Sequence, residues 1–129
     1  QMSLYAHCHY AQPTCHAARY SLRTDGFASV HAGYIPGEML THPLRFTGTR
    51  LALNVATSAA GEVRVEVQDA GGQALPGKAL TDCRPIIGDE IARVVAWQDG
   101  SDLSALAGQT VRLRIQMKDA DLFALQFTA

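Results

Sequence analysis

Three histidines and two cysteines crowd the first 16 residues and are the side chains best suited to bind a metal. They are His7, Cys8, His9, Cys15 and His16. Imidazole nitrogens and thiolate sulfurs are ligands that zinc and copper prefer. The spacing matches no established zinc motif, so solvated side chains are the competing interpretation. No cofactor is expected, and His7, His9 and His16 are the candidate ligands if zinc is captured adventitiously.

Carboxylates form a second group, in the segment 82–90. Asp82, Asp89 and Glu90 could serve as acid and base in glycoside hydrolysis, or hold structural calcium through their oxygens. The competing interpretation is turn chemistry, in which Asp caps backbone amides and Glu90 pairs with Arg93 or Arg84. We favour the turn interpretation. The sequence predicts a small β-sandwich, as described below, and such a fold seldom has the cleft that a glycosidase needs. The expectation is a protein that is not an enzyme and has no catalytic residue.

Exposed aromatic rings suggest a third chemistry, carbohydrate binding. A sugar ring stacks its C–H face on an aromatic side chain, while carboxylates and guanidiniums bond its hydroxyls. Tyr34, in a Gly-Pro turn, and Trp97 are the candidate platforms, although packing at the edge of the fold is the competing role for Trp97. Asp89, Glu90 and Arg93 are the polar candidates.

Nucleophilic catalysis has little support in the sequence. The Gly-x-Ser-x-Gly, phosphate-loop and His-Glu-x-x-His motifs are absent. Ser29 and His31 are two residues apart and share one face of an expected strand, but the sequence offers no third residue to orient the histidine.

Three cysteines leave at least one thiol without a partner in the chain. A disulfide between Cys8 and Cys15 and reduced thiols are both open, and reduced thiols are the simpler alternative.

The elements that must position these residues are strands. Residues 111–118 alternate apolar and polar side chains without a break, which indicates a strand with one face toward water. Other strands are expected, with turns between them, at 19–23, 27–32, 39–46, 51–56, 62–68, 74–80, 91–97 and 123–127. The segment 24–26 and the segment 119–121 are expected to close hairpins. The continuous apolar run 91–97 predicts a central strand, and 101–106 predicts one helical turn capped by Ser101.

These segments predict an all-β protein. About nine strands at roughly ten-residue spacing favour a two-sheet antiparallel β-sandwich, of jelly-roll or Greek-key type, over a closed barrel. Residues 1–18 have no clear periodicity and are expected to be a lead-in segment, followed by a sandwich domain over 19–129.

Charge and length limit the partners. The chain has 129 residues, with 11 basic and 12 acidic side chains interspersed and a formal net charge of -1. Without a basic stripe, nucleic acid is not an expected partner. No apolar stretch approaches the roughly 20 residues of a membrane helix, so no membrane partner is expected either.

Six sequence segments are distinctive in combination: Arg19–Phe27, Leu53–Gly61, Val63–Ala70, Ile87–Glu90, Val111–Arg114 and Lys118–Leu122. With them the chain resembles the carboxy-terminal β-sandwich of bacterial five-bladed propeller proteins that are similar to invertases and inulinases. The resemblance extends from Leu4 to Phe127.

The resemblance implies an accessory role. In that family the catalytic acid and nucleophile lie in the propeller, which this chain does not contain. The chain is therefore expected to be a non-catalytic module that packs on a catalytic propeller domain or binds carbohydrate. The alternative is a structural module that forms homo-oligomers through its sheet edges and amino-terminal segment. The histidines and cysteines of the lead-in depart from the family pattern.

Overall fold

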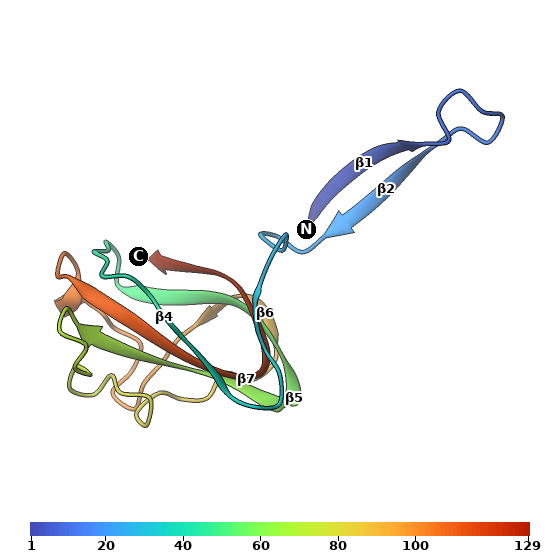
Figure 1. Cartoon of the computed structure of the whole chain (residues 1–129). Helices are drawn as coiled ribbons and strands as arrows, with labels where there is room; N and C mark the ends of the chain where they lie inside the picture. Colours follow the sequence, from blue (N-terminus) through green and yellow to red (C-terminus); the bar gives the residue numbers. More distant parts are fainter.

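The computed structural model describes residues 1–129 and is built almost entirely of antiparallel strands (Figure 1). The elements are β1 (Met2–Cys8), β2 (His16–Leu22), β3 (Val30–Ala32), β4 (Gly37–Leu40), β5 (Arg50–Asp69), β6 (Asp89–Val94), a 3₁₀ turn at Ser104–Leu106, and β7 (Val111–Thr128). β1 and β2 form a two-stranded sheet, and a second sheet has the order β3-β7-β5-β6, with β4 also paired to β7. The expected all-β, antiparallel class is confirmed.

β5 and β7 organise the second sheet. They pair from Arg50 opposite Thr128 to Asp69 opposite Val111, with an interruption at residues 58–61 of β5. Both strands curve strongly, so that the two halves of the sheet face each other (Figure 1). The apolar side chains from both halves meet in one core. Its fully buried strand residues include Leu51, Leu53, Val55, Val63, Val65, Val67, Leu113 and Ile115.

Gly61 permits the bend. A Cβ atom added at Gly61 would lie 2.3 Å from the carbonyl oxygen of Asp119 and 2.6 Å from that of Lys118. Asp119 itself has φ 43, a left-handed conformation that Asp tolerates better than most residues. The pairing register shifts between Thr57 and Glu62, where β5 bends. A residue with any side chain would push the two strands apart here.

The number of strands is a correction to the expectation. Residues 51–56 and 62–68 lie in the single bent strand β5, and the segment 119–121 bends β7 instead of closing a hairpin. Seven strands replace the nine expected. The two sheets found are a hairpin and a five-stranded sheet, so a sandwich of two separate sheets is not confirmed.

The amino-terminal segment also differs from the expectation. Residues 2–8 and 16–22 form a hairpin in full register, and the boundary expected after residue 18 falls inside β2. Residues 24–26 turn the chain from this hairpin toward the larger sheet instead of joining 19–23 to 27–32. Figure 1 shows the hairpin standing away from the five-stranded sheet. The sequence of residues 1–18 did not predict strands clearly, because the side chains on each face of the hairpin mix apolar residues with cysteine and histidine.

Four smaller predictions were also inaccurate. β4 ends at Leu40, before Pro43, and residues 74–80 contribute one isolated bridge, from Ala74 to Gln68. β6 is an edge strand with Ile91 half exposed, although its apolar run suggested a central strand. The 3₁₀ turn is preceded by Asp102, which accepts the N–H of Ser104 at 2.9 Å in place of the expected Ser101 cap.

Where β6 does not reach, residues of the loops form hydrogen bonds with the backbone along the same edge of β5. Val63, Val65 and Val67 turn their backbone N–H and C=O groups to this edge. The partners are the backbone of Ile86 for Val63, the Cys83 thiol and Trp97 indole for Val65, and the backbone of Lys78 and Leu75 for Val67. These groups satisfy the buried backbone that a neighbouring strand would otherwise pair.

Candidate functional site

The three histidines named as metal ligands do not converge. Cys8 and His16 are cross-strand partners, whereas His7 pairs with Ala17 and points to the opposite face of the hairpin. The rings of His9 and His16 lie 5.5 Å apart, edge to face. No group of three histidine, cysteine or acidic side chains in the structure is placed to hold a metal. The hairpin therefore offers a pair of imidazoles, which is fewer ligands than zinc requires.

Trp97 cannot serve as a sugar platform because it is fully buried. Its Nε1 donates to the carbonyl oxygen of Val65 at 2.9 Å, and the Lys78 ammonium lies 4.9 Å from the ring centroid. The competing prediction, a packing role, matches this position. Tyr34, by contrast, is 73% exposed in the loop between β3 and β4 and remains an available ring.

The polar candidates form ion pairs along β6. Glu90 pairs with Arg93 at 2.6 Å, as the turn interpretation predicted, and Asp89 pairs with Arg23. The carboxylate of Asp82 accepts the N–H of Ala79 at 3.3 Å. The five carbohydrate candidates thus separate into three places: the exposed Tyr34, the buried Trp97 and the β6 ion pairs.

Arg23 is the residue that the sequence analysis missed. Its Nε donates to Oδ1 of Asn54 at 2.5 Å, a second nitrogen donates to the Val55 carbonyl at 3.2 Å, and its guanidinium lies 4.8 Å from the Phe123 ring centroid. Together with the Asp89 ion pair, these contacts fasten the base of the hairpin to the sheet. The available signal was Asn54, a polar residue inside an apolar strand, because a buried amide requires partners.

Ser29, His31 and Asp121 meet at the pairing of β3 with β7. The Ser29 hydroxyl donates to Asp121 Oδ1 at 2.7 Å, and His31 Nδ1 lies 3.1 Å from the same oxygen. Asp121 is the orienting third residue that the sequence did not reveal. A serine nucleophile, however, must donate its proton to the histidine, and here the hydroxyl is bound to the carboxylate. Ser29 and His31 are exposed and Asp121 is half-buried, and the two bonds link β3 and the residue before it to β7.

A cross-strand ion-pair group lies where β4, β7 and β5 adjoin. Arg114 donates to both carboxylate oxygens of Glu38, at 2.8 and 3.0 Å, and lies 3.6 Å from the buried Glu66. The hydrogen bond from Arg114 lowers the pKa of Glu38 below its usual 4.5. These charges are already paired with one another across β4, β7 and β5, so they stabilise the sheet and are not available to bind a ligand.

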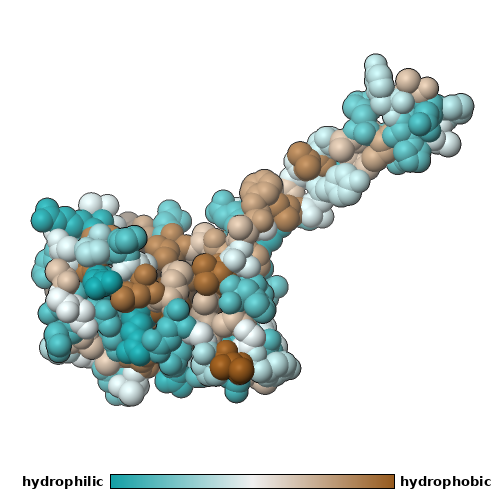
Figure 2. Space-filling model, viewed as in Figure 1, coloured by the Kyte–Doolittle hydropathy of each residue, from teal (hydrophilic) through white to brown (hydrophobic).

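Apolar side chains line one face of the hairpin. In the register of β1 and β2, Leu4 lies opposite Tyr20, Ala6 opposite Ala18, and Met2 opposite Leu22. No other element covers this face: Leu4 is 65% exposed and Tyr20 is 54% exposed. Figure 2 shows apolar surface continuing from the larger body along the hairpin. We call the apolar side chains of β1 and β2 on this side the hairpin face.

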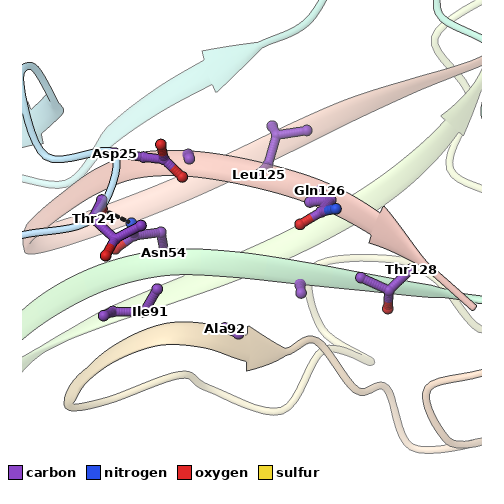
Figure 3. Close-up of a pocket in the computed structure, with 10 residues that line it drawn as sticks. Thr24, Asp25, Asn54, Ile91, Ala92, Leu125, Gln126 and Thr128 are labelled. Carbon is purple, nitrogen blue, oxygen red and sulfur yellow. Dashed lines mark hydrogen bonds between the residues drawn. The ribbon is translucent and has the colours of Figure 1, made fainter. Parts of the chain in front are cut away.

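An open groove of about 420 Å³ lies on the outer side of β5, between β6 and the end of β7. Figure 3 shows Ile91 and Ala92 on one side of it and Gln126 and Thr128 on the other, with Asp25 at one end. The lining residues are Thr24, Asp25, Ala52, Asn54, Ile91, Ala92, Ala124, Leu125, Gln126 and Thr128. We call this the outer groove.

No family model matches the chain, and neither a curated protein nor a solved structure matches it. None of the structure's helical segments has the length and apolar character needed to cross a membrane. Two physical features of the molecule remain as guides to its function: the hairpin face and the outer groove.

Proposed function

We propose that this chain is a non-catalytic accessory module of a glycoside-hydrolase-like protein, and that it packs on a catalytic propeller domain through the hairpin face. The observation that carries the proposal is the distribution of exposed large apolar side chains. Four of them, Leu4, Tyr5, Tyr10 and Tyr20, belong to the hairpin of residues 2–22, and Leu4 and Tyr20 are cross-strand partners on the hairpin face. Exposed apolar surface concentrated on one segment is typical of an interaction site.

The energetics of the hairpin favour a partner. A two-stranded hairpin alone is marginally stable in water, and both edges of this one carry unpaired backbone groups. Burial of Leu4 and Tyr20 against another surface would contribute about 1.5–3 kcal/mol for each large apolar side chain. A partner sheet could also supply hydrogen bonds to a free edge by strand addition.

The charge of the hairpin limits the kind of partner surface that can bind to it. Residues 1–24 contain Arg19 and Arg23 but no carboxylate, so all 12 acidic residues lie farther along the chain. Arg23 is already paired with Asp89, which leaves Arg19 as the free guanidinium charge of the hairpin. A neutral or acidic partner surface with an open sheet edge complements the hairpin.

Binding to a purified five-bladed propeller domain of the invertase and inulinase class tests the proposal. Analytical ultracentrifugation of the mixture should give a one-to-one complex, and Leu4→Ser with Tyr20→Ser should weaken binding at least tenfold. Tyr34→Ser, which removes an equally exposed ring outside the hairpin, is the matched control and should bind as the parent does. Absence of a complex with the parent chain, or equal weakening by the control, would contradict the proposal.

Self-assembly is the second candidate, and the two free edges of the hairpin are the observation that favours it. Two hairpins could pair edge to edge into a four-stranded sheet around a two-fold axis. In that case the chain alone would sediment as a dimer, and deletion of residues 1–18 would give a monomer. A chain that is monomeric alone and forms a complex only with the propeller would exclude this candidate.

A further inference from the structure

The outer groove has the dimensions of a small-ligand site. Its volume of about 420 Å³ falls in the range of roughly 300–1,000 Å³ that ligand sites occupy. It lies beside the base of the hairpin, where Thr24 and Asp25 form one end of it. The groove belongs to the rigid sheet, because its floor is made by β5 and the end of β7 (Figure 3).

Short side chains keep the groove hollow. Ala52, Ala92 and Ala124 line it from three neighbouring strands, and Ile91 adds an aliphatic side chain that is half exposed. Longer side chains at the alanine positions would occupy the space. The result is a shallow apolar floor, which suits the C–H face of a sugar ring.

Polar groups stand at the rim with their bonding capacity unused. The side chains of Asp25, Gln126 and Thr128 make no hydrogen bond within the chain and line the same groove. They offer a carboxylate acceptor, an amide that both donates and accepts, and a hydroxyl. This combination matches the rim of a neutral sugar, whose hydroxyls donate and accept in pairs.

The side chain of Asn54 holds the backbone immediately before Asp25. Asn54 is almost completely buried, and its Nδ2 donates to the Thr24 carbonyl oxygen at 2.7 Å. Its Oδ1 receives the bond from Arg23. Asp25 follows with φ 54, which Asp and Asn adopt more readily than most residues. The buried amide therefore fixes the backbone from which Asp25 projects, and the exposed carboxylate itself makes no bond within the chain that a ligand would have to displace.

We propose that the outer groove binds a neutral oligosaccharide, with Asp25 and Gln126 bonding hydroxyls of a sugar ring that rests on the alanine floor. This site goes beyond the packing role proposed above and differs from the Tyr34 and Trp97 platforms. Asp25 is the one charged residue that lines the groove, so anionic sugars are disfavoured. Without an aromatic ring, the affinity should be modest, with a dissociation constant on the order of 0.1–1 mM.

Nuclear magnetic resonance titration of the full chain tests the site. The probes are soluble fructo-, malto-, cello- and xylo-oligosaccharides, added separately to ¹⁵N-labelled protein. One class should give saturable shifts at the backbone amides of Asp25, Ala52, Ile91 and Gln126. No saturable shift at these amides with any of the four probes would overturn the proposal.

Variants assign the binding to the groove. Asp25→Asn, which keeps the left-handed conformation accessible, and Gln126→Ala should each weaken binding at least fivefold, and Ala124→Leu should fill the floor and abolish it. Tyr34→Ala should bind as the parent does. Loss of binding in Tyr34→Ala together with full binding in the groove variants would place the sugar elsewhere. The hairpin variant Leu4→Ser with Tyr20→Ser should retain the sugar, so failure of the packing role and failure of this site are distinguishable.

Discussion

Arg23 Nε lies 2.5 Å from Oδ1 of Asn54, and this bond joins the end of the hairpin to the middle of the first half of β5. The arginine follows β2 directly, and the asparagine is almost fully buried between Leu53 and Val55. One buried amide thus connects the two sheets and also holds the Thr24 carbonyl at the end of the outer groove.

Replacement of Arg23 by Ala should destabilise the protein. The change leaves Asn54 Oδ1 without its donor and removes the ion pair to Asp89, so the free energy of unfolding should fall by about 1–3 kcal/mol. Urea denaturation measures this, and hydrogen exchange should show lost protection in β1 and β2. Arg19→Ala is the control, because Arg19 bonds only the exposed Ser3, and it should cost less than about 0.5 kcal/mol. Equal losses in both variants would contradict the anchoring role.

Trp97→Phe should also be costly, although it keeps an aromatic ring. The indole N–H is the donor to the buried Val65 carbonyl, and phenylalanine leaves that oxygen unpaired, at a cost of about 1–3 kcal/mol. Trp97→Ala should cost about 3–5 kcal/mol because it adds a cavity. Thermal unfolding followed by circular dichroism gives both values. If Trp97→Phe were as stable as the parent, the Val65 carbonyl would not depend on the indole.

Gly61→Ala tests the bend shared by β5 and β7. The new Cβ would meet the Asp119 carbonyl oxygen at 2.3 Å, so the strands must separate, and the free energy of unfolding should fall by about 2–3 kcal/mol. Gly33→Ala is the matched control, because nothing lies within 4 Å of its added Cβ, and it should change stability by less than about 0.5 kcal/mol. Chemical denaturation of both variants checks the difference. A neutral Gly61→Ala would mean that the bend accommodates a side chain.

The Glu38 carboxylate predicts one component of acid sensitivity. Arg114 lowers its pKa below the usual 4.5 in the folded protein, so Glu38 binds a proton more readily when unfolded. Its contribution to stability is therefore complete above the unfolded value and is lost as the pH falls through the folded value. Unfolding midpoints in urea between pH 6 and pH 2 should fall less steeply in Glu38→Gln than in the parent. Identical slopes would show that the pair does not couple to folding.

The Cys15 and Cys83 thiols should differ in reactivity. Burial raises the pKa of Cys83 above its usual 9.0, and its sulfur accepts the N–H of Val65 at 3.2 Å, whereas Cys15 is exposed. Iodoacetamide at pH 8 should modify Cys15 rapidly and Cys83 only after unfolding, since the thiolate is the reactive species. Mass spectrometry of the digested protein measures each site. Early modification of Cys83 in the folded chain would contradict its burial.

The alternating pattern predicted where strands lie better than how they connect. Residues 111–118 are a strand, as their strict alternation indicated. A bend and a reversal, however, both require a small residue such as Gly61, so the sequence could not distinguish one curved strand from a hairpin. The continuous apolar run 91–97 similarly could not distinguish an edge strand from a central one, because Trp97 is buried by its loop and Ile91 is not.

The candidate sites show the same division. Exposure of Tyr34 followed from its turn, but the position of Asp25 beside Gln126 depends on a sheet pairing that joins distant segments. The Arg23–Asn54 bond spans 31 positions, and only the presence of a polar residue in an apolar strand hinted at it. Side chains that converge from different strands cannot be found by spacing along the chain.

The long pairing of β5 with β7 has a consequence for synthesis of the protein. Every strand of the five-stranded sheet other than these two pairs with one of them, and the β5–β7 ladder joins residues such as Leu51 and Phe127 that are far apart in sequence. Such non-local contacts form slowly, because the chain must close long loops before any contact is gained. On the ribosome, β5 can pair with β6, but its other edge must stay open and its apolar side chains uncovered until β7 has emerged, and this interval is when the chain most needs protection from aggregation.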